Sequence, residues 1–347
     1  MKRFAVIGYG GQGAWHCTQL LKSDVAALAG TYDIRAIRRE AAVANGIFVY
    51  ESNEAIFADP SVDGVVVAVP NDLHEELVIA ALRAGKHVIC EKPVEMSCAS
   101  VDRMIAAAKE SGKCFTVHQN RRFDVDFRAI KGILESGEIG APLHITSCIH
   151  GSRGIPSDWR CEKAHGGGMI LDWGVHLIDQ MLQLIPDPIE RVGCHCTHYT
   201  NAEVDDGFKI DLYFTTGITA RIELGTYNFI AMPRFYLQAK SGSAIISDWK
   251  HPCHVAKLTK WIEKDVTPVQ NAAGITKTMA PRDHLTLDEY DLPIPKCDVH
   301  DFYRNFCAAM DGEAEQLVTH AQMRRVMQVM EAAFLSDEKK QILSVNI

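Results

Sequence analysis

A lysine and a histidine, each close to a carboxylate, are the residues of this sequence that could carry acid–base chemistry. Lys92 stands in Glu91-Lys92-Pro93, directly after the apolar run Val88-Ile89-Cys90. Proline ends a strand and holds the preceding residue extended, so we expect Lys92 at a fixed strand end, pointing away from the sheet. Ligands of open α/β sheets bind at this edge, outside the carboxyl ends of the strands.

The histidine lies in a second segment, which begins with three consecutive glycines, Gly166-Gly167-Gly168. The residues that follow predict one α-helix, in which Asp172, His176 and Asp179 occupy positions i, i+4 and i+7 and form a polar stripe. The other residues of this helix are mostly apolar. The stripe is therefore either a solvated edge or the wall of a site.

A glycine fingerprint opens the chain. The buried-strand run Phe4-Ala5-Val6-Ile7 leads into Gly8-Tyr9-Gly10-Gly11-Gln12-Gly13, and a helix is predicted over residues 14–21. In the pattern G-x-G-x-x-G the first glycine permits a tight turn, the second lets the backbone approach a pyrophosphate, and the third lets the helix pack on the strand. The N–H groups of the helix then face the anion.

An acidic residue at the end of the second predicted strand indicates which dinucleotide would bind. Asp33 follows the strand over residues 26–32, roughly twenty residues after the second fingerprint glycine, the offset of a carboxylate that binds the adenosine ribose. A carboxylate there repels a 2′-phosphate, which favours NAD over NADP. Arg35, Arg38 and Arg39 lie close behind it and could bind a phosphate instead.

Strand and helix signals alternate through the first third of the chain. Strands are predicted over 63–69, 88–90 and 114–117, with helices ending at Ala84 and spanning 97–111. Repeated βα units with a fingerprint at the first turn predict a doubly wound parallel Rossmann sheet. Pro70, Asn71 and His74 follow one strand end and Gln119 follows another. We place the boundary of this α/β domain at residues 1–122.

Beyond this boundary, a helix over 124–136 is followed by a succession of strands, which predicts an α+β domain over residues 123–347 built on a large, mostly antiparallel open sheet. A sheet with one uncovered face would form a subunit interface, so we expect a homodimer or homotetramer. Two helices, over 299–310 and 319–335, are predicted near the end, and the stripe of Met323, Val326, Met327, Met330 and Phe334 should be core. We expect a loop from His251 to His254. The predicted strands span 143–150, 191–199, 208–215, 218–224, 234–239 and 244–248.

Composition narrows the class of protein. The 347 residues are 47% hydrophobic and 23% charged with a net charge of -8, which is ordinary for a globular protein and argues against a nucleic-acid or membrane partner. No apolar run is long enough to span a bilayer, and Met1-Lys2-Arg3 leads directly into a strand, so we expect a cytoplasmic protein. The eleven cysteines include Cys194 and Cys196, beside His198 on one strand face, but zinc usually takes ligands from turns, so we expect no metal.

Taken together, the fingerprint, Glu91-Lys92-Pro93 and the glycine run before Asp172-x-x-x-His176 resemble the glucose-fructose oxidoreductase and inositol dehydrogenase (Gfo/Idh/MocA) family. Trp159-Arg160 and Arg121-Arg122-Phe123 also look like family segments. The resemblance implies that Lys92, Asp172 and His176 are catalytic and, with Arg122, bind the substrate. The cofactor would be NAD, with NADP less favoured. Its implied contacts are Gly8, Gly10, Gly11, Gln12, Gly13, Asp33, Pro70, Asn71, His74, Glu91, Lys92, Gln119, Trp159 and Arg160.

The resemblance implies an NAD(P)-dependent oxidoreductase that transfers a hydride between the nicotinamide and a ring secondary alcohol of a sugar, glycoside or inositol. His176 would take the hydroxyl proton, and Lys92 would stabilise the developing alkoxide. The alternative is redox-neutral glycoside cleavage through transient oxidation and elimination, with His150, His165 or Tyr227 as an additional acid or base. A non-catalytic dinucleotide sensor is a third hypothesis, although a sensor has no need of Lys92, Asp172 and His176 together.

Overall fold

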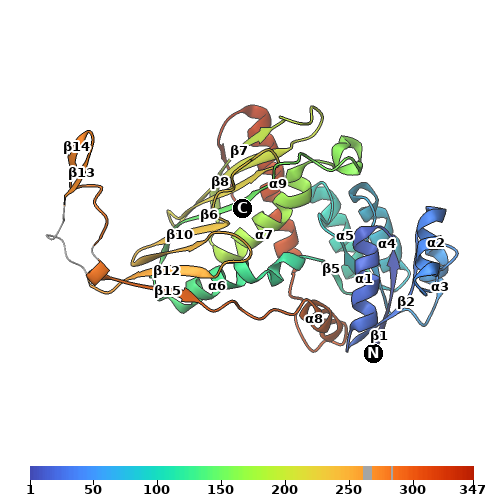
Figure 1. The fold of residues 1–347 in the computed structure, drawn as a ribbon. Helices are drawn as coiled ribbons and strands as arrows, with labels where there is room; N and C mark the ends of the chain where they lie inside the picture. The colour runs from blue at the N-terminus through green and yellow to red at the C-terminus, as the bar shows by residue number, and fades with distance from the viewer. Residues whose placement is uncertain (261–267, 283) are drawn as a thin grey trace.

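The computed structural model describes residues 1–260, 268–282 and 284–347 and contains two large sheets (Figure 1). The amino-terminal sheet has five parallel strands in the order β2-β1-β3-β4-β5. Its strands are almost wholly buried because helices cover both faces, as in doubly wound folds. The strands are β1 Lys2–Ile7, β2 Ala26–Tyr32, β3 Gly64–Val67, β4 His87–Cys90 and β5 Phe115–Val117, and the helices of this part are α1 Gly11–Lys22, α2 Ala36–Ala44, α3 Asn53–Ala58, α4 His74–Arg83 and α5 Cys98–Ser111.

The second sheet has nine strands in the order β15-β12-β11-β10-β6-β9-β8-β7-β16. The neighbours β6 and β9 are parallel, and the other pairs of the described sheet are antiparallel, so the predicted fold class is confirmed. A hairpin of β13 Val269–Asn271 and β14 Gly274–Thr276 stands apart from the body (Figure 1). The sheet strands are β6 Pro142–His150, β7 Ile189–Thr197, β8 Gly207–Phe214, β9 Thr219–Gly225, β10 Phe235–Ala239, β11 Gly242–Ile246, β12 Cys253–Leu258, β15 Leu287–Leu292 and β16 Leu343–Ser344.

Three helices, α6 Val125–Ser136, α7 Val175–Leu184 and α9 His320–Lys339, pack on one face of this sheet. Met323, Met327 and Met330 of α9 are buried, as expected from their helical spacing.

The loop expected from His251 to His254 is wrong in part, because β12 begins at Cys253 and His254 pairs with Ile245 in the sheet. The 3-10 helices are η1 Asn71–Leu73, η2 Asn120–Phe123, η3 Trp159–Cys161, η4 Lys163–His165 and η6 His284–Thr286, and η5 Ile170–Gly174 is π-helical.

Helix α8, His300–Met310, belongs to the second part of the sequence but packs on the amino-terminal sheet (Figure 1). Phe302, Tyr303 and Phe306 are buried, and the ring of Phe306 lies 6.1 Å from that of Phe4 in β1. The division into residues 1–122 and 123–347 stays a prediction, and α8, from the second part of the sequence, contributes to the packing of the first sheet. None of the described helices is long and apolar enough to cross a membrane.

A buried ion pair joins the connection after β5 to helix α7. Arg122 Nη2 and Nε donate to the two carboxylate oxygens of Asp179, at 2.6 and 2.8 Å, and Nη1 donates to the carbonyl oxygen of Leu317 and to Gln322. Arg122 and Asp179 are only 5% and 2% exposed, so either charge would be left uncompensated without the other. Arg122, which was predicted to bind the substrate, thus uses its side chain to fix helix α7.

We expect Arg122→Gln to lower the free energy of unfolding by about 3–5 kcal/mol, because it leaves the Asp179 carboxylate buried and without its cation. Urea denaturation followed by circular dichroism measures this loss. Arg324→Gln is the matched control: Arg324 pairs with Asp102 at 2.8 Å on the surface, and its loss should cost no more than about 1 kcal/mol. Equal losses in the two variants would contradict the structural role of Arg122.

Candidate active site

The glycine fingerprint forms the turn between β1 and α1. Gly8 has φ +95°, and a Cβ there would lie 2.2 Å from the carbonyl oxygen of Ala68, so only glycine fits. A Cβ on Gly13 would lie 2.0 Å from the Gly8 oxygen, which explains why α1 can pack so closely on β1. At Gly10 and Gly11 an added Cβ would meet nothing within 4 Å in the described chain. The open backbone face at α1 fits an approaching pyrophosphate.

Asp33 connects this turn to the end of β2. Its carboxylate accepts the N–H of Tyr9 at 2.7 Å and the N–H of Arg35 at 2.8 Å. Arg39 donates to the carbonyl oxygens of Asp33 and Ile34, whereas Arg35 and Arg38 are exposed. Asp33 is therefore fixed beside the turn, as a ribose-binding carboxylate requires. A guanidinium for a 2′-phosphate would have to come from the exposed arginines.

The residues after β3 hold the site together. Asn71 is buried and donates from Nδ2 to the carbonyl oxygen of Gly166 at 3.0 Å, which ties this strand end to the glycine run of the second segment. The ring nitrogens of buried His74 lie 3.0 Å from the carbonyl oxygens of Val69 and Pro93. The structure thus gives Asn71 and His74 positioning contacts, while Pro70, between Val69 and Asn71, is partly exposed at the same edge.

Lys92 and Asp172 meet where the two halves of the chain face each other. Lys92 Nζ donates to the carbonyl oxygen of Asp172 at 2.8 Å and to its carboxylate at 3.0 Å. Arg160 Nε donates to the other carboxylate oxygen at 3.1 Å, and its guanidinium lies over the ring of Trp159. Burial alone would raise the pKa of Asp172, but the charges of Lys92 and Arg160 outweigh it and lower that pKa. Asp172 is therefore a carboxylate between two cations.

His176 lies beside this pair and is 3% exposed. Its Nδ1 is 3.3 Å from Gln119 Oε1. An amide oxygen accepts hydrogen bonds, so this contact favours the tautomer with the proton on Nδ1 and the lone pair on Nε2. Burial, together with the charges of Lys92 and Arg121, holds the pKa of His176 well below its ordinary value. The imidazole is thus neutral near pH 7 and can accept a proton at Nε2.

The segment that carries Asp172 and His176 differs from the continuous α-helix predicted. Residues Ile170–Gly174 form a π-helical turn, and the regular helix α7 begins at Val175. The polar stripe is not a solvated edge, since Asp172 contacts Lys92 and Asp179 contacts Arg122. π-Helical turns occur frequently at functional sites. This one contains Asp172 and ends at Gly174, two residues before His176.

The glycine run explains how the π-helical turn is held. A Cβ on Gly168 would lie 2.3 Å from Asp205 Oδ1, and one on Gly167 would lie 2.4 Å from the carbonyl oxygen of Arg160. The Asp205 carboxylate accepts the N–H of Ile170 at 2.8 Å. Burial raises the pKa of Asp205 to about 6, although its backbone hydrogen bonds act in the opposite direction. The glycines therefore allow a buried acid to reach the start of η5.

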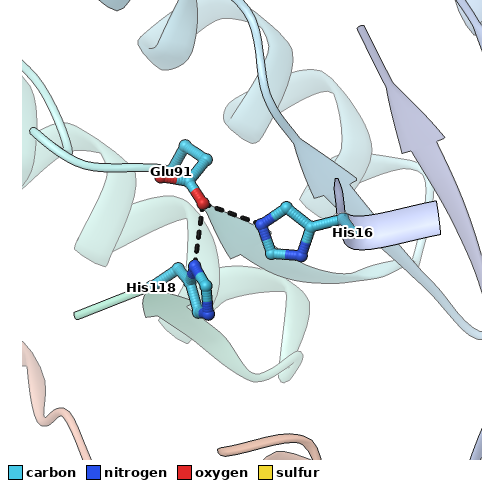
Figure 2. Close-up of side chains that lie close together, drawn as sticks. All are labelled: His16, Glu91 and His118. Atoms are coloured by element: carbon cyan, nitrogen blue, oxygen red, sulfur yellow. Dashed lines mark hydrogen bonds and ion pairs between the residues drawn. The ribbon is translucent and has the colours of Figure 1, made fainter. Parts of the chain in front are cut away.

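Glu91, the residue before Lys92, is the centre of a buried cluster with His16 and His118 (Figure 2). Its Oε1 lies 2.7 Å from His16 Nε2 and 2.8 Å from His118 Nδ1, and its Oε2 accepts the backbone N–H of Lys92. His16 Nδ1 lies 2.6 Å from the hydroxyl of Tyr303 in α8. Burial would raise the pKa of Glu91, but its interactions with His118 and His16 hold it well below its ordinary value. Glu91 thus fixes the backbone of Lys92 and not its ammonium group.

His16, Glu91 and His118 also have the residue types of a metal site, with their ligand atoms within 4.8 Å of one another. Nitrogen and oxygen ligands at about 2.0–2.2 Å from one zinc ion would lie roughly 3.3 Å apart. The separations of 2.7 and 2.8 Å are those of hydrogen bonds. We therefore interpret the three residues as a hydrogen-bonded cluster that compensates a buried carboxylate.

The segment from Cys194 to His198, at the end of β7, contacts helix α9 and the turn that follows it in the sequence. Cys194 Sγ and Cys196 Sγ lie 4.0 Å apart, and their backbone N–H groups donate to Ser336 and Asp337 of α9. The ring of His198 faces the carbonyl oxygen of Val204 at 3.0 Å. These contacts attach the strand to helix α9 and to the following turn.

Several residues of the site were missed by the sequence analysis. Arg121 stacks on the ring of Trp173 at 4.0 Å and lowers the pKa of His176. His16, His118 and Asp205 carry no local pattern that distinguishes them. Position was one signal, since His118 and Arg121 lie within two residues of the predicted residue Gln119, directly after a strand, and the resemblance had marked Arg121 as part of a family segment. Among the additional acids or bases considered, His150 pairs with Glu223, His165 pairs with Asp72, and Tyr227 packs against Phe229.

The site combines a glycine turn that fits a dinucleotide, a lysine at a later strand end and a neutral histidine from a second domain. This combination defines a dinucleotide-dependent oxidoreductase. The profile of the GFO/IDH/MocA oxidoreductase family, with an NAD-binding Rossmann fold, matches residues 2–119, and that of its C-terminal domain matches residues 127–245. The chain belongs to the Gfo/Idh/MocA family of oxidoreductases.

Relatives and solved structures agree with this assignment. A myo-inositol 2-dehydrogenase of Thermotoga maritima is 33% identical over 66% of this chain and 67% of its own length. An NADP-dependent scyllo-inositol 2-dehydrogenase of Bacillus subtilis is 31% identical over 55% of this chain and 54% of its own length. The crystal structure of an NAD-binding protein from Listeria innocua is 42% identical, with a TM-score of 0.95 over 99% of both chains. The predicted family and enzyme class are thus confirmed.

The raised pKa of Asp205 predicts a pH-dependent contribution to stability. The folded protein takes up this proton at higher pH than the unfolded chain, so the stabilisation is complete below about pH 4 and is lost as the pH rises through about 6. The side chain of Asp205→Asn stays neutral at both pH values. We therefore expect its free energy of unfolding, relative to that of wild type, to rise by up to about 3 kcal/mol between pH 4.5 and 7.5. Urea denaturation at the two pH values measures this. The same difference at both would contradict a buried, titrating Asp205.

Proposed function

We propose that the protein is an NAD-dependent dehydrogenase that transfers a hydride between nicotinamide and a ring secondary alcohol of a sugar, glycoside or inositol. The observation that carries the proposal is the juxtaposition of Lys92, Asp172 and a neutral His176 with its lone pair at Nε2. The named activities of the Thermotoga and Bacillus relatives support a cyclic polyol or sugar as the substrate class.

The residues of the chain divide the reaction between them. Oxidation of a CH–OH group releases a proton from the oxygen and a hydride from the carbon, and bound nicotinamide would accept the hydride. His176 Nε2 takes the hydroxyl proton as the C–O bond becomes a carbonyl. Lys92 uses two of its three N–H groups on Asp172, and the third stabilises the developing charge on the substrate oxygen. Asp172 keeps Lys92 in place.

The test of the function is the absorbance of reduced nicotinamide when purified protein and NAD are given inositols, free hexoses and glycosides. We expect a rise with one of these classes, and a loss of about 10²- to 10⁴-fold in kcat for His176→Gln. Because the pKa of His176 is lowered, the rate of oxidation should fall only at pH values below about 6.5. His195→Gln, whose ring is exposed, is the matched control and should keep the wild-type rate.

A glycoside cleaved without a change in absorbance would replace this proposal with the redox-neutral mechanism. Unchanged turnover in Lys92→Met would contradict the catalytic role of Lys92, and the absence of turnover with every compound would leave only a dinucleotide-binding protein. Circular dichroism of each variant establishes whether a loss of rate comes from the site or from unfolding.

The preference for NAD is proposed from Asp33. A carboxylate at the end of β2 accepts the ribose hydroxyls of NAD and repels the 2′-phosphate of NADP. We expect Asp33→Ser to raise the KM for NAD and to lower that for NADP, each by roughly tenfold, because the repulsion is removed while the exposed Arg35 and Arg38 remain. Steady-state kinetics with both cofactors measure this. An unchanged ratio of the two KM values would contradict the selector role.

The partner we propose is a small carbohydrate or polyol, and the assembly a homodimer or homotetramer formed through the face of the nine-stranded sheet opposite α6, α7 and α9. Outward-facing residues of β10 support this assembly, since Tyr236 is 40% exposed between buried Phe235 and Leu237. A large sheet with helices on one face only favours a subunit contact on the other face.

A further inference from the structure

Three rings follow one another outward from the candidate catalytic histidine. The centroids of the His176 and Trp173 rings are 6.1 Å apart with a T-shaped geometry. Trp249, in the turn after β11, stacks on Trp173 with centroids 6.3 Å apart and an angle of 17°. Trp249 comes from a different part of the sequence than Asp172 and His176, and it lies one indole farther from the reaction centre.

Trp249 is 52% exposed, whereas Trp173 is partly buried between neighbours. The guanidinium of Arg121 lies over the Trp173 ring at 4.0 Å. Trp173 is therefore supported both by a cation and by a second indole. The exposed indole at the end of this stack is that of Trp249.

The turn that carries Trp249 is held by its own hydrogen bonds. Asp248 Oδ1 accepts the N–H of Lys250 at 2.7 Å and lies 2.8 Å from His251 Nδ1. The residues beside Trp249 in the sequence are thus polar, and the hydrogen bonds that fix the turn do not involve the indole. A half-exposed tryptophan in such a turn, fixed in orientation by stacking, has the properties of a preformed contact surface.

We propose that Trp249 is a stacking platform for the group attached to the ring that is oxidised: a second sugar ring or an aromatic aglycone. The inference rests on the proposed function and narrows its substrate class to glycosides. The C–H face of a pyranose, or an aryl ring, lies flat on an indole and is removed from water there. An inositol has a single ring, which would occupy the position at His176 and leave the platform unused.

A platform of this kind acts on binding and not on the chemical step. It contacts a part of the substrate that does not change during hydride transfer, so ground state and transition state are stabilised equally. Loss of Trp249 should therefore raise KM with little change in kcat.

The experiment compares matched phenyl and methyl glycosides of glucose, galactose and mannose, with myo-inositol as the single-ring polyol. We expect Trp249→Ala to raise the KM for the phenyl glycoside that is oxidised by roughly 5- to 10-fold, with kcat and the KM of the methyl glycoside nearly unchanged. Trp249→Phe should keep most of the affinity. The matched control is Phe48→Ala, which removes an exposed aromatic side chain from the part of the chain before β3.

A second measurement separates this inference from the proposed function. Calorimetric titration of the same glycosides into protein saturated with NADH, which cannot oxidise an alcohol, reports binding without turnover. Weaker binding of the phenyl compound to Trp249→Ala alone supports the platform even if no redox activity is found.

Three results overturn the inference. One is equal affinity of wild type for phenyl and methyl compounds, and another is oxidation of inositols alone. The third is a change in oligomeric state of Trp249→Ala on size-exclusion chromatography, which would make the indole a subunit contact. In the first two cases the dehydrogenase proposal still stands if the absorbance of reduced nicotinamide rises.

Discussion

The contact between Lys92 and Asp172 is the interaction on which the arrangement of the site depends. It joins the end of β4 to the π-helical turn before α7, so it crosses from one sheet system to the other. The two side chains are only 17% and 12% exposed, which makes each charge dependent on its partner. Glu91 fixes the backbone of Lys92, and Asp205 fixes the beginning of the turn that carries Asp172. The hydrogen bonds of Glu91 and those of Asp205 therefore each fix one partner of this ion pair.

The cations of the site each have a carboxylate partner. Lys92 and Arg160 contact Asp172, Arg160 also contacts Asp158, and Arg121 contacts Asp124. Burial, followed by the charges of Lys92 and Arg121, keeps His176 unprotonated. The lysine that can stabilise the alkoxide of an alcohol that is losing its proton therefore also helps to keep the base neutral.

Local rules in the sequence predicted the parts of the structure that depend on neighbours in the chain. The turn from Gly8 to Gly13 and the strand end at Lys92 follow from glycine and proline geometry, and Asp33 follows from its offset to the fingerprint. Alternating strands and helices predicted the first sheet, and the succession of strands predicted the second. The π-helical turn could not be predicted, because it depends on Asp205 reaching Gly168 from a distant loop.

Long-range pairing also explains the other differences. Arg122 was expected at the substrate, since nothing in its vicinity indicates that Asp179 will neutralise it in the interior. The partners of Glu91 come from α1 and the end of β5, which only the folded sheet brings together (Figure 2). Phe334 continues the methionine stripe of α9 in sequence but is 37% exposed, because periodicity indicates a helical face and not where its contact ends.

The return of α8 to the amino-terminal sheet has a consequence for the order of folding during synthesis. Domains generally fold as units while the ribosome is still extending the chain, starting from the amino terminus. Here the face of β1 that carries Phe4, and the buried His16, lack Phe306 and Tyr303 until residues 300–310 have been made. The nascent Rossmann sheet therefore remains incomplete while eight of the nine strands of the second sheet emerge, and its final closure is one of the last events of translation.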